Sequence, residues 1–515
     1  MSSRAGRALR AVALVLLAAA LLAPSAHAGR VTVVVVPSLD PIEATEDGAI
    51  GLLVPGAGST VTRAGALSSL VRGKVVSSLL GGKATGKPLI RLSGQAETAA
   101  VTIYVTLPAP GRSHNTRRYP IAIVGGGYRG LLVSRTTRIP GLVSIADVAP
   151  TAVALARGNT PVIRSDELET AATLRLVDLD RRLRRAHDTR TAATIVLVAS
   201  TLVLAGLGLI LRSPLLARAG LLAIPAALTS SLALSAAGVS RPTQVTVALA
   251  VATGVGALGA AARRSWLSPT LVAFLVAEVV VLAVWPEVNA LSVIGPHPDG
   301  GGRYFGVTNE VETLLLAPIL AAAAIAPKAV LLPLAAISVA LVGWSHAGAD
   351  GGGIVVVLVS LAALWAFREG IRVTLFRAAV ALVGVGALAF AIVGVDALTG
   401  GSSHVTSAVG GGPGSLAGDL AHRVRISWKG VIATTQARVT AGATLCALIG
   451  VGLRRPRVAV VDALLIGLAA SLLVNDTPTD VLAFGALATA ALGAWATQRS
   501  GEDAFPRASR EPPLR

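Results

Sequence analysis

Cysteine is almost missing from this chain of 515 residues: the single one, Cys446, lies inside an apolar run. One thiol excludes a disulfide framework and a cysteine-based metal site. Charged residues are also scarce, at 14%, and aromatic residues amount to only 3%. With 53% hydrophobic residues, this composition is typical of an integral membrane protein and not of a soluble domain. The net charge of +18 does not indicate nucleic acid, because the basic residues gather at the ends of apolar segments.

The first 28 residues have the pattern of a signal peptide. Three arginines precede an apolar core over 11–22, and Ala26-His27-Ala28 is a small-x-small cleavage site. An uncleaved membrane anchor is the alternative. Both interpretations place the residues that follow outside the cytoplasm.

Residues 29–165 predict an extracytoplasmic α/β domain. Apolar runs at 31–36, 101–107 and 121–124 predict strands, and helical patterns such as 64–80 lie between them. This alternation favours a mainly parallel sheet. The next segment, 166–190 with Ser165 as N-cap, predicts an amphipathic helix. That helix either couples the domain to the membrane part or lies on the membrane surface as a stalk.

Residues 191–496 predict an all-α polytopic transmembrane bundle of about eleven helices. The apolar runs lie at 191–211, 215–237, 243–262, 266–285, 311–326, 329–345, 353–367, 376–395, 430–452, 458–474 and 479–496. If the α/β domain is outside, arginines and lysines concentrate at the inner ends of these runs, as the positive-inside rule requires. The prediction is therefore a multi-pass protein of the plasma membrane with a disordered cytoplasmic tail over 497–515.

Three polar patterns fall on loops that this topology places outside: 300–310, 346–353 and 475–480. Glycines in the first two permit positive φ and close backbone approach. Thr308 or Asn309 is predicted to cap the helix that starts near Val311. The alternative is that loops between spans are polar by default, with Arg303 and Glu310 merely paired with each other.

These loops and the long loop 397–428 supply the candidate site residues. An anionic group would bind to six of them: Arg303, Tyr304, Asn309, His346, Arg423 and Arg425. The candidate bases are Glu310, Asp350 and Asp476. Glu278 differs from all of these because it lies inside a predicted span, where an acid is costly unless it is paired or faces a cavity. It is either a structural hydrogen-bonding group, with Arg438 as the best charged partner, or part of a transport path.

Two segments of the α/β domain carry a family pattern. Residues 140–151 contain Pro140-Gly141, Asp147 and Pro150-Thr151, and Ser59 is followed four residues later by Arg63. They resemble the late segment and the nucleophile signature of alkaline-phosphatase-like domains, which include sulfatases and phosphodiesterases. The Gly-Arg-Tyr-Phe-Gly-x-x-Asn-Glu and Asn-Asp-x-Pro loops are similar to those of bacterial envelope proteins that join such a domain to a polytopic bundle.

The resemblance implies two metal ions held by Asp and His residues, and the chain departs from the family there. Only Asp40 follows the first predicted strand, and 101–107 ends in Leu107-Pro108-Ala109-Pro110 without an Asp-His pair. Without a metal, Ser59 would have neither a lowered pKa nor charge neutralisation for a phosphate transition state. The prediction is a degenerate domain with no metal and no cofactor, in which Ser59 is a weak candidate nucleophile.

Three functions stay open on the sequence. The bundle could work on a lipid-linked glycan or phospholipid head group at its outer loops. It could be a transporter or flippase, with Glu278 lining the path. It could also be a non-catalytic scaffold whose outer domain binds envelope proteins. The lipid bilayer is a partner in all three, and nucleic acid in none.

Overall fold

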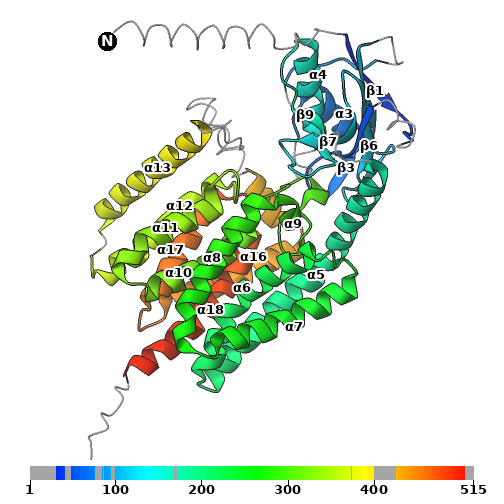
Figure 1. Ribbon diagram of the computed structural model, residues 1–515. Coiled ribbons are helices and arrows are strands. Elements are labelled where there is room, and N and C mark those ends of the chain that lie inside the picture. The colour runs from blue at the N-terminus through cyan, green and yellow to red at the C-terminus, as the bar shows by residue number, and fades with distance from the viewer. Residues whose placement is uncertain are drawn as a thin grey trace, which may run out of the picture.

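The computed structural model describes residues 30–40, 48–75, 84, 86–93, 99–166, 171–372, 374–398 and 425–504 (Figure 1). It consists of an N-terminal region built on a mixed sheet and a mostly helical C-terminal part with several long apolar helices. The predicted signal peptide, most of the 397–428 loop and the last residues of the tail lie outside the described residues.

The sheet has the strand order β1-β4-β6-β2-β7-β9, with β8 also paired to β2. The bounds are β1 Val31–Val36, β2 Gly48–Val54, β4 Val101–Thr106, β6 Tyr119–Gly125, β7 Gly130–Ser134, β8 Leu142–Ser144 and β9 Ile163–Asp166. A small ribbon pairs β3 (Thr60–Thr62) with β5 (Arg112–His114). The expectation of a mainly parallel sheet was wrong, because β6 lies between β4 and β2 in the sheet and runs antiparallel to both.

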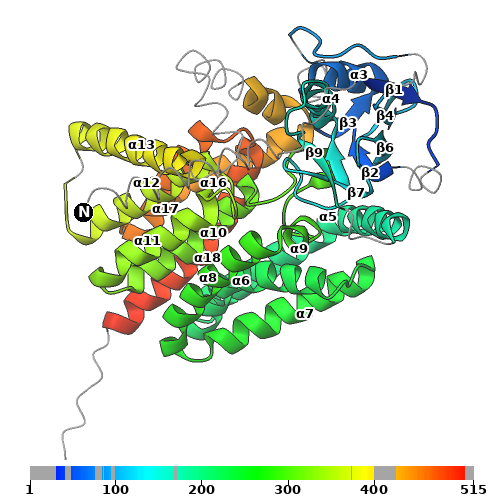
Figure 2. The same cartoon turned by 45° about the horizontal axis from the view of Figure 1, so that its top comes forward.

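Period-two alternation along β2 gives the sheet two buried faces. Ala49 and Leu53 pack on the side of α3 (Arg63–Arg72) and α4 (Val148–Ala156). Ile50, between them, packs on the other side against Ala172 and Leu176 of α5. The start of the long helix α5 therefore completes the core of the sheet region (Figure 2).

Helix α5 runs without a break from Ala172 to Ile210, 39 residues in all. The predicted connecting helix and the first predicted span are thus one rigid rod of about 58 Å. Ser165 is not its N-cap, because its extended backbone belongs to β9 and pairs with Leu132 of β7.

Eight helices of the described chain are long and apolar enough to cross a membrane. They are α5, α6 (Pro214–Ala236), α7 (Pro242–Ala261), α8 (Leu267–Val284, preceded by η3 Arg264–Trp266), α12 (Gly351–Arg368), α13 (Leu375–Leu398), α16 (Thr435–Leu453) and α18 (Pro478–Ala504). Large apolar side chains such as Ile195, Val247 and Val383 are exposed along them. Such surfaces are compatible with a membrane protein, since lipid would cover them.

The shorter helices α9 (Pro286–Ala290), α10 (Asn309–Ile325), α11 (Lys328–Gly343) and α17 (Ala459–Val474) complete the bundle. Helix α10 is its centre, because every residue from Glu312 to Ala323 is buried. We call the end of the bundle beside the sheet region the domain end, and the opposite end the far end. Helices α10, α12 and α18 all begin at the domain end.

Candidate functional site

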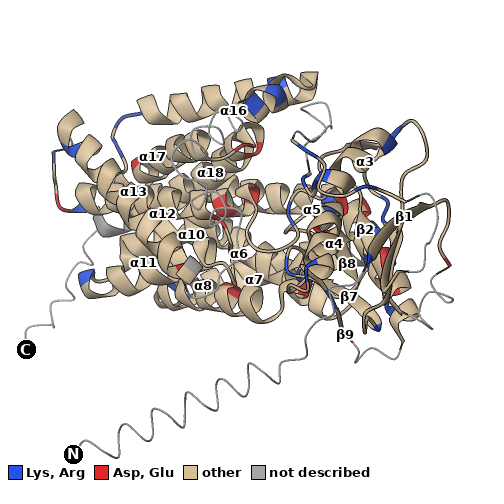
Figure 3. Cartoon of the chain, turned by 90° about the horizontal axis from the view of Figure 1, so that it is seen from above, with Lys and Arg blue, Asp and Glu red and all other residues tan. Residues whose placement is uncertain are grey.

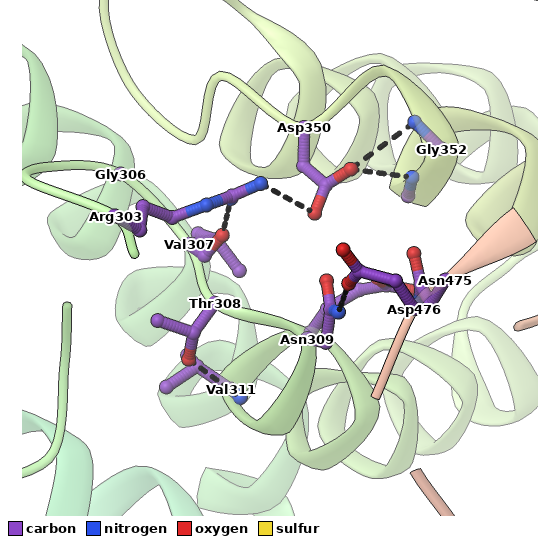
Figure 4. A network of polar contacts seen from close by, with 12 residues as sticks. Arg303, Gly306, Val307, Thr308, Asn309, Val311, Asp350, Gly352, Asn475 and Asp476 are labelled. Atoms are coloured by element: carbon purple, nitrogen blue, oxygen red, sulfur yellow. Dashed lines mark hydrogen bonds and ion pairs between the residues drawn. The ribbon is translucent and has the colours of Figure 1, made fainter. Parts of the chain in front are cut away.

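The three predicted polar loops meet at the domain end, where α10, α12 and α18 begin (Figure 4). Thr308 caps α10 and accepts a hydrogen bond from the amide of Val311 at 3.3 Å, which confirms the predicted helix start. Asp350 caps α12 and accepts from the amides of Gly352 and Gly353, each at 3.1 Å. The N-terminal ends of α10, α12 and α18, which carry partial positive charge, therefore point into one small region.

Side chains link these helix starts to one another. Arg303 Nη2 lies 3.2 Å from Asp350 Oδ2, and Arg303 also donates to the carbonyl oxygen of Val307. Asn309 Nδ2 donates to Asp476 Oδ1 at 3.1 Å and to the hydroxyl of Thr477 at 2.9 Å. Segments more than a hundred residues apart, such as those with Asn309 and Asp476, are thus brought together. Arg303 pairs with Asp350, however, and not with Glu310.

Glycines make the close approach possible. Gly301 and Gly306 have φ of 65° and 81°, as expected for this loop. A side chain on Gly306 would collide with the carbonyl oxygen of Gly348, and one on Gly301 with that of Gly56. The 300–310 loop therefore contacts both the 346–353 loop and the sheet region through backbone atoms, with no side chain between them.

Glu312 is the site residue that sequence reasoning did not single out. Its side chain is fully buried, and its Oε2 accepts from Asn475 Nδ2 at 2.9 Å. Its Oε1 has no hydrogen-bond partner among the described residues. An unpaired buried carboxyl oxygen is costly, so a purely structural role for Glu312 would be unfavourable.

Together with Glu312, four further carboxylates gather at these helix starts: Glu310, Asp350, Asp476 and Asp480. Asp480, in the first turn of α18, lies within electrostatic reach of Glu310 and Asp476. Seen from above, several Asp and Glu positions, coloured red, lie in the middle of the bundle near α10 and α18 (Figure 3). We call these five residues the carboxylate cluster. Helix amides partly balance its charge, and its chemistry suits acid–base work.

Among the described residues, no group of three or more His, Cys, Asp or Glu side chains has the arrangement of a metal site. His297 lies close to Glu310, with 3.8 Å between its Nε2 and Glu310 Oε2. Burial lowers the pKa of His297, and Arg190 and His187 act in the same direction, against Glu310 and Asp299. Glu310 therefore faces an imidazole that loses its proton more readily than a free one, and such a ring can both donate and accept a proton.

His297 belongs to a polar chain that joins α5 to the bundle. Asp299 Oδ2 lies 2.6 Å from His187 Nδ1, and Arg190 Nη2 lies 3.2 Å from Asp299 Oδ1. Burial opposes ionisation of Asp299, but Arg190 and the two histidines together hold its pKa below the usual range. The long helix α5 is thus connected by ion pairs to the cluster at α10.

The remaining predicted site residues lie outside the cluster. Tyr304 is buried between the sheet region and the bundle, where it packs against Ile139 and Leu142. His346 is exposed beside Trp344, with ring centroids 5.2 Å apart. Arg425 is exposed at the start of a helical stretch, whereas Arg423 lies outside the described residues.

Glu278 is buried in α8 and lines a small cavity with Asn289, Gly306 and Val307. The part of the chain that the structure describes gives its carboxyl group no hydrogen-bond or ion-pair partner. Arg438 is not that partner, because it is exposed and bonds to Thr434 and Thr435 of its own helix.

Asp147, the acid of the phosphatase-like pattern, has a structural role here. It accepts hydrogen bonds from Ser134 Oγ and Thr136 Oγ1, each at 2.7 Å, and forms a capping box with Ser144. Burial raises its pKa, while these three hydrogen bonds act in the opposite direction. Ser59, the candidate nucleophile, is exposed, and its carbonyl oxygen accepts from the amide of Asn115.

Comparisons with protein-family models, with curated proteins and with solved structures found no match to this chain. The phosphatase-like resemblance therefore stays a prediction that rests on the sequence patterns alone. The candidate site is argued from its own geometry.

Proposed function

We propose that this chain is a bacterial envelope protein that handles a lipid-linked, anionic substrate at the domain end of its bundle. The observation that carries the proposal is the meeting of three distant polar loops around the buried Glu312. Such a concentration of polar groups is costly beside a bilayer and is retained where chemistry or transport needs it.

The roles follow from the contacts. Arg303 would hold the phosphate of the substrate, since its pair with Asp350 uses only part of its five-donor fork. Glu310 would move a proton, with the imidazole of His297 as its exchange partner. Arg425 would add positive charge near the domain end.

The phosphatase-like domain would be non-catalytic in this function. Asp147 is occupied as a helix cap, and the chain after β2 is docked on the bundle: the amide of Gly58 donates to the carbonyl oxygen of Gly300 at 3.0 Å. A domain with this contact would position the loop that carries Arg303.

The proposal requires the domain end to face outward, which labelling of single cysteines tests. With Cys446 replaced by serine, His114→Cys should react with a membrane-impermeant maleimide in intact cells, because His114 is exposed on the sheet region. Arg372→Cys, exposed between α12 and α13 at the far end, should react only after permeabilisation. The reverse pattern would put the carboxylate cluster in the cytoplasm and contradict the proposal.

Lipids that co-purify with the protein test the substrate. Mass spectrometry should find a phosphate-linked lipid enriched over the membrane average in the wild type. Arg303→Ala should reduce this enrichment at least roughly tenfold through loss of the charge-assisted contacts. Glu310→Gln should keep the lipid bound yet fail to restore growth of a strain that lacks the gene.

Arg438→Ala, which removes an exposed arginine with contacts only to its own helix, is the matched control and should behave like the wild type. Arg303→Lys keeps a positive charge beside Asp350. Loss of lipid in this variant can therefore be assigned to substrate binding and not to misfolding. Equal lipid retention in the wild type and Arg303→Ala, with both folded, would rule out Arg303 as the phosphate ligand.

Transport is the second candidate, and the position of Glu278 favours it. This acid lies in α8 beneath Gly306 and Val307, so a proton or a polar group could pass from the carboxylate cluster toward the interior of the bundle.

A further inference from the structure

A cavity lies in the sheet region, between α5 and the face of the sheet that this helix covers. Ala172 and Leu176 of α5 pack against β2, β6 and β7, whereas Tyr104 of β4 is only partly buried on the same face. Helix α5 therefore does not fill this face, and a cavity of about 260 Å³ lies beside it. Pockets for drug-sized molecules measure roughly 300–1,000 Å³, so this cavity suits a smaller molecule.

Most of the cavity wall is apolar. The apolar side chains come from β2, from β6 and the residue before its centre, and from α5: Ile50, Leu52, Pro120, Ile121, Leu176 and Val177. Val177 is 57% exposed, so part of this apolar surface is open to solvent. Covering apolar surface with a ligand is favourable, and the wall therefore predicts a ligand with an apolar body.

Three charged residues also line the cavity: Arg118, which precedes β6, and Asp180 and Arg184 of α5. Both carboxylate oxygens of Asp180 are paired. Arg118 Nη2 lies 2.7 Å from Oδ1, and Arg184 Nη2 lies 2.7 Å from Oδ2. Asp180 is the only acid among the described residues of the wall. Two arginines and one aspartate leave a formal charge of +1, which a ligand with one negative charge would balance.

Arg118 has a donor that the fold does not use. Its side chain is fully buried, and Nε and Nη2 donate to the side chain and the carbonyl oxygen of Asp180. These contacts hold α5 to the sheet region. Nη1 is also buried, and it has no hydrogen-bond partner among the described residues. A buried guanidinium donor without an acceptor is costly, so an acceptor supplied by a ligand would stabilise it.

We propose that this cavity binds a small carboxylate with an apolar body, such as a short-chain fatty acid. After a small adjustment of the guanidinium, Arg118 Nη1 donates to the carboxylate, and the charge of Arg184 attracts it. The hydrocarbon chain lies along the apolar wall. The charge of the wall favours a carboxylate over a phosphate monoester, which carries about −1.5 to −2 at neutral pH. The site is independent of the proposed function, since none of its residues belongs to the carboxylate cluster.

Calorimetric titration of the full chain in lipid nanodiscs tests the site with four probes: hexanoate, hexanol, acetate and hexyl phosphate. Empty nanodiscs give the background from partition into lipid. Hexanoate should bind at least roughly tenfold more tightly than hexanol, which lacks the charge, and than acetate, which lacks most of the apolar body. Hexyl phosphate should bind less tightly than hexanoate, because its additional charge is not balanced in the cavity.

Three variants assign the binding to this cavity. Arg118→Lys keeps a positive charge beside Asp180 but has no equivalent of Nη1, so the affinity for hexanoate should fall roughly tenfold. Val177→Phe keeps both arginines and fills part of the cavity from an exposed position, and it should also weaken binding. Arg181→Ala is the matched control, because Arg181 pairs with Asp178 on the exposed side of α5 and does not line the cavity. It should bind hexanoate like the wild type.

The melting temperature without a probe shows whether each variant is folded. The proposal would be overturned by a wild type that binds hexanoate no more tightly than hexanol or acetate. A folded Arg118→Lys or Val177→Phe protein with full affinity would also overturn it. An equal loss in Arg181→Ala would assign the effect to general surface charge and contradict a site. Tighter binding of hexyl phosphate than of hexanoate would show a site for phosphate esters and not for a carboxylate.

Discussion

Glu312→Gln is expected to reduce turnover of the captured lipid by roughly 100-fold or more, the usual contribution of a positioned acid or base. The substitution keeps the shape of the side chain and an oxygen that accepts from Asn475 Nδ2. It removes the ability to take up and release a proton. Because the native carboxyl group already leaves Oε1 unpaired, the free energy of unfolding should change by no more than about 1 kcal/mol.

Measuring lipid turnover and melting temperature on the same preparation separates chemistry from folding. Glu369→Gln is the matched control: it makes the same chemical change at the far end, where Glu369 pairs with the exposed Lys328. It should alter neither quantity appreciably, since exposed pairs contribute about 0–1 kcal/mol. A Glu312→Gln protein with full turnover would mean that the carboxylate cluster has a structural role and no role in the chemistry.

Hydropathy and helix caps predicted that these loops lie at the same end of the bundle, but not that they contact one another. Alternation of apolar runs places the loops before α10, α12 and α18 on one face, and a threonine and an aspartate mark two of the helix starts. The meeting of Arg303 with Asp350 follows from that topology, although the sequence equally allowed Arg303 to pair with Glu310.

Glu312 escaped sequence reasoning because an acid in a first helical turn is an ordinary stabilising feature. Glu312 is unusual because α10 lies at the centre of the bundle and neighbouring helices bury the side chain. The amino-acid pattern of α10 alone does not predict that burial. Tyr304 was misplaced for a related reason. It was assigned to an open rim, yet the sheet region docks over that loop and buries it.

Ser165 shows where local propensity is overridden. A serine followed by acids and a helical apolar pattern is a strong signal for an N-cap. Pairing of 163–166 with β7 outweighs it, because the strand completes the edge of the sheet. The helix then begins only at Ala172.

Asn115→Ala is expected to loosen the docking of the sheet region on the bundle by about 2 kcal/mol, roughly a 30-fold increase in local opening. Asn115 is 1% exposed, and its Nδ2 donates to the carbonyl oxygens of Gly56, Gly58 and Gly300. Alanine would leave these carbonyls without that donor. The loss is limited because Asn115 Oδ1 has no partner among the described residues to lose.

Hydrogen exchange of the amides in 56–60 and 298–306 measures this opening. Asn159→Ala, at an exposed position on the same domain, should leave exchange unchanged. A second anchor limits the effect of Asn115→Ala: Arg138 donates to the carbonyl oxygen of Ser345 at 2.7 Å and lies 3.9 Å over the ring of Phe305. Combining Asn115→Ala with Arg138→Ala should therefore increase exchange well beyond either change alone.

Substrate retention in the same variants shows whether docking matters for function. Gly300 and Phe305 contact the sheet region, whereas Arg303, which lies between them in the loop, contacts Asp350 of the bundle. If the sheet region positions Arg303, lipid retention should fall in step with the increase in exchange. Faster exchange with unchanged retention would mean that Asp350 alone fixes Arg303, and that the sheet region serves another purpose.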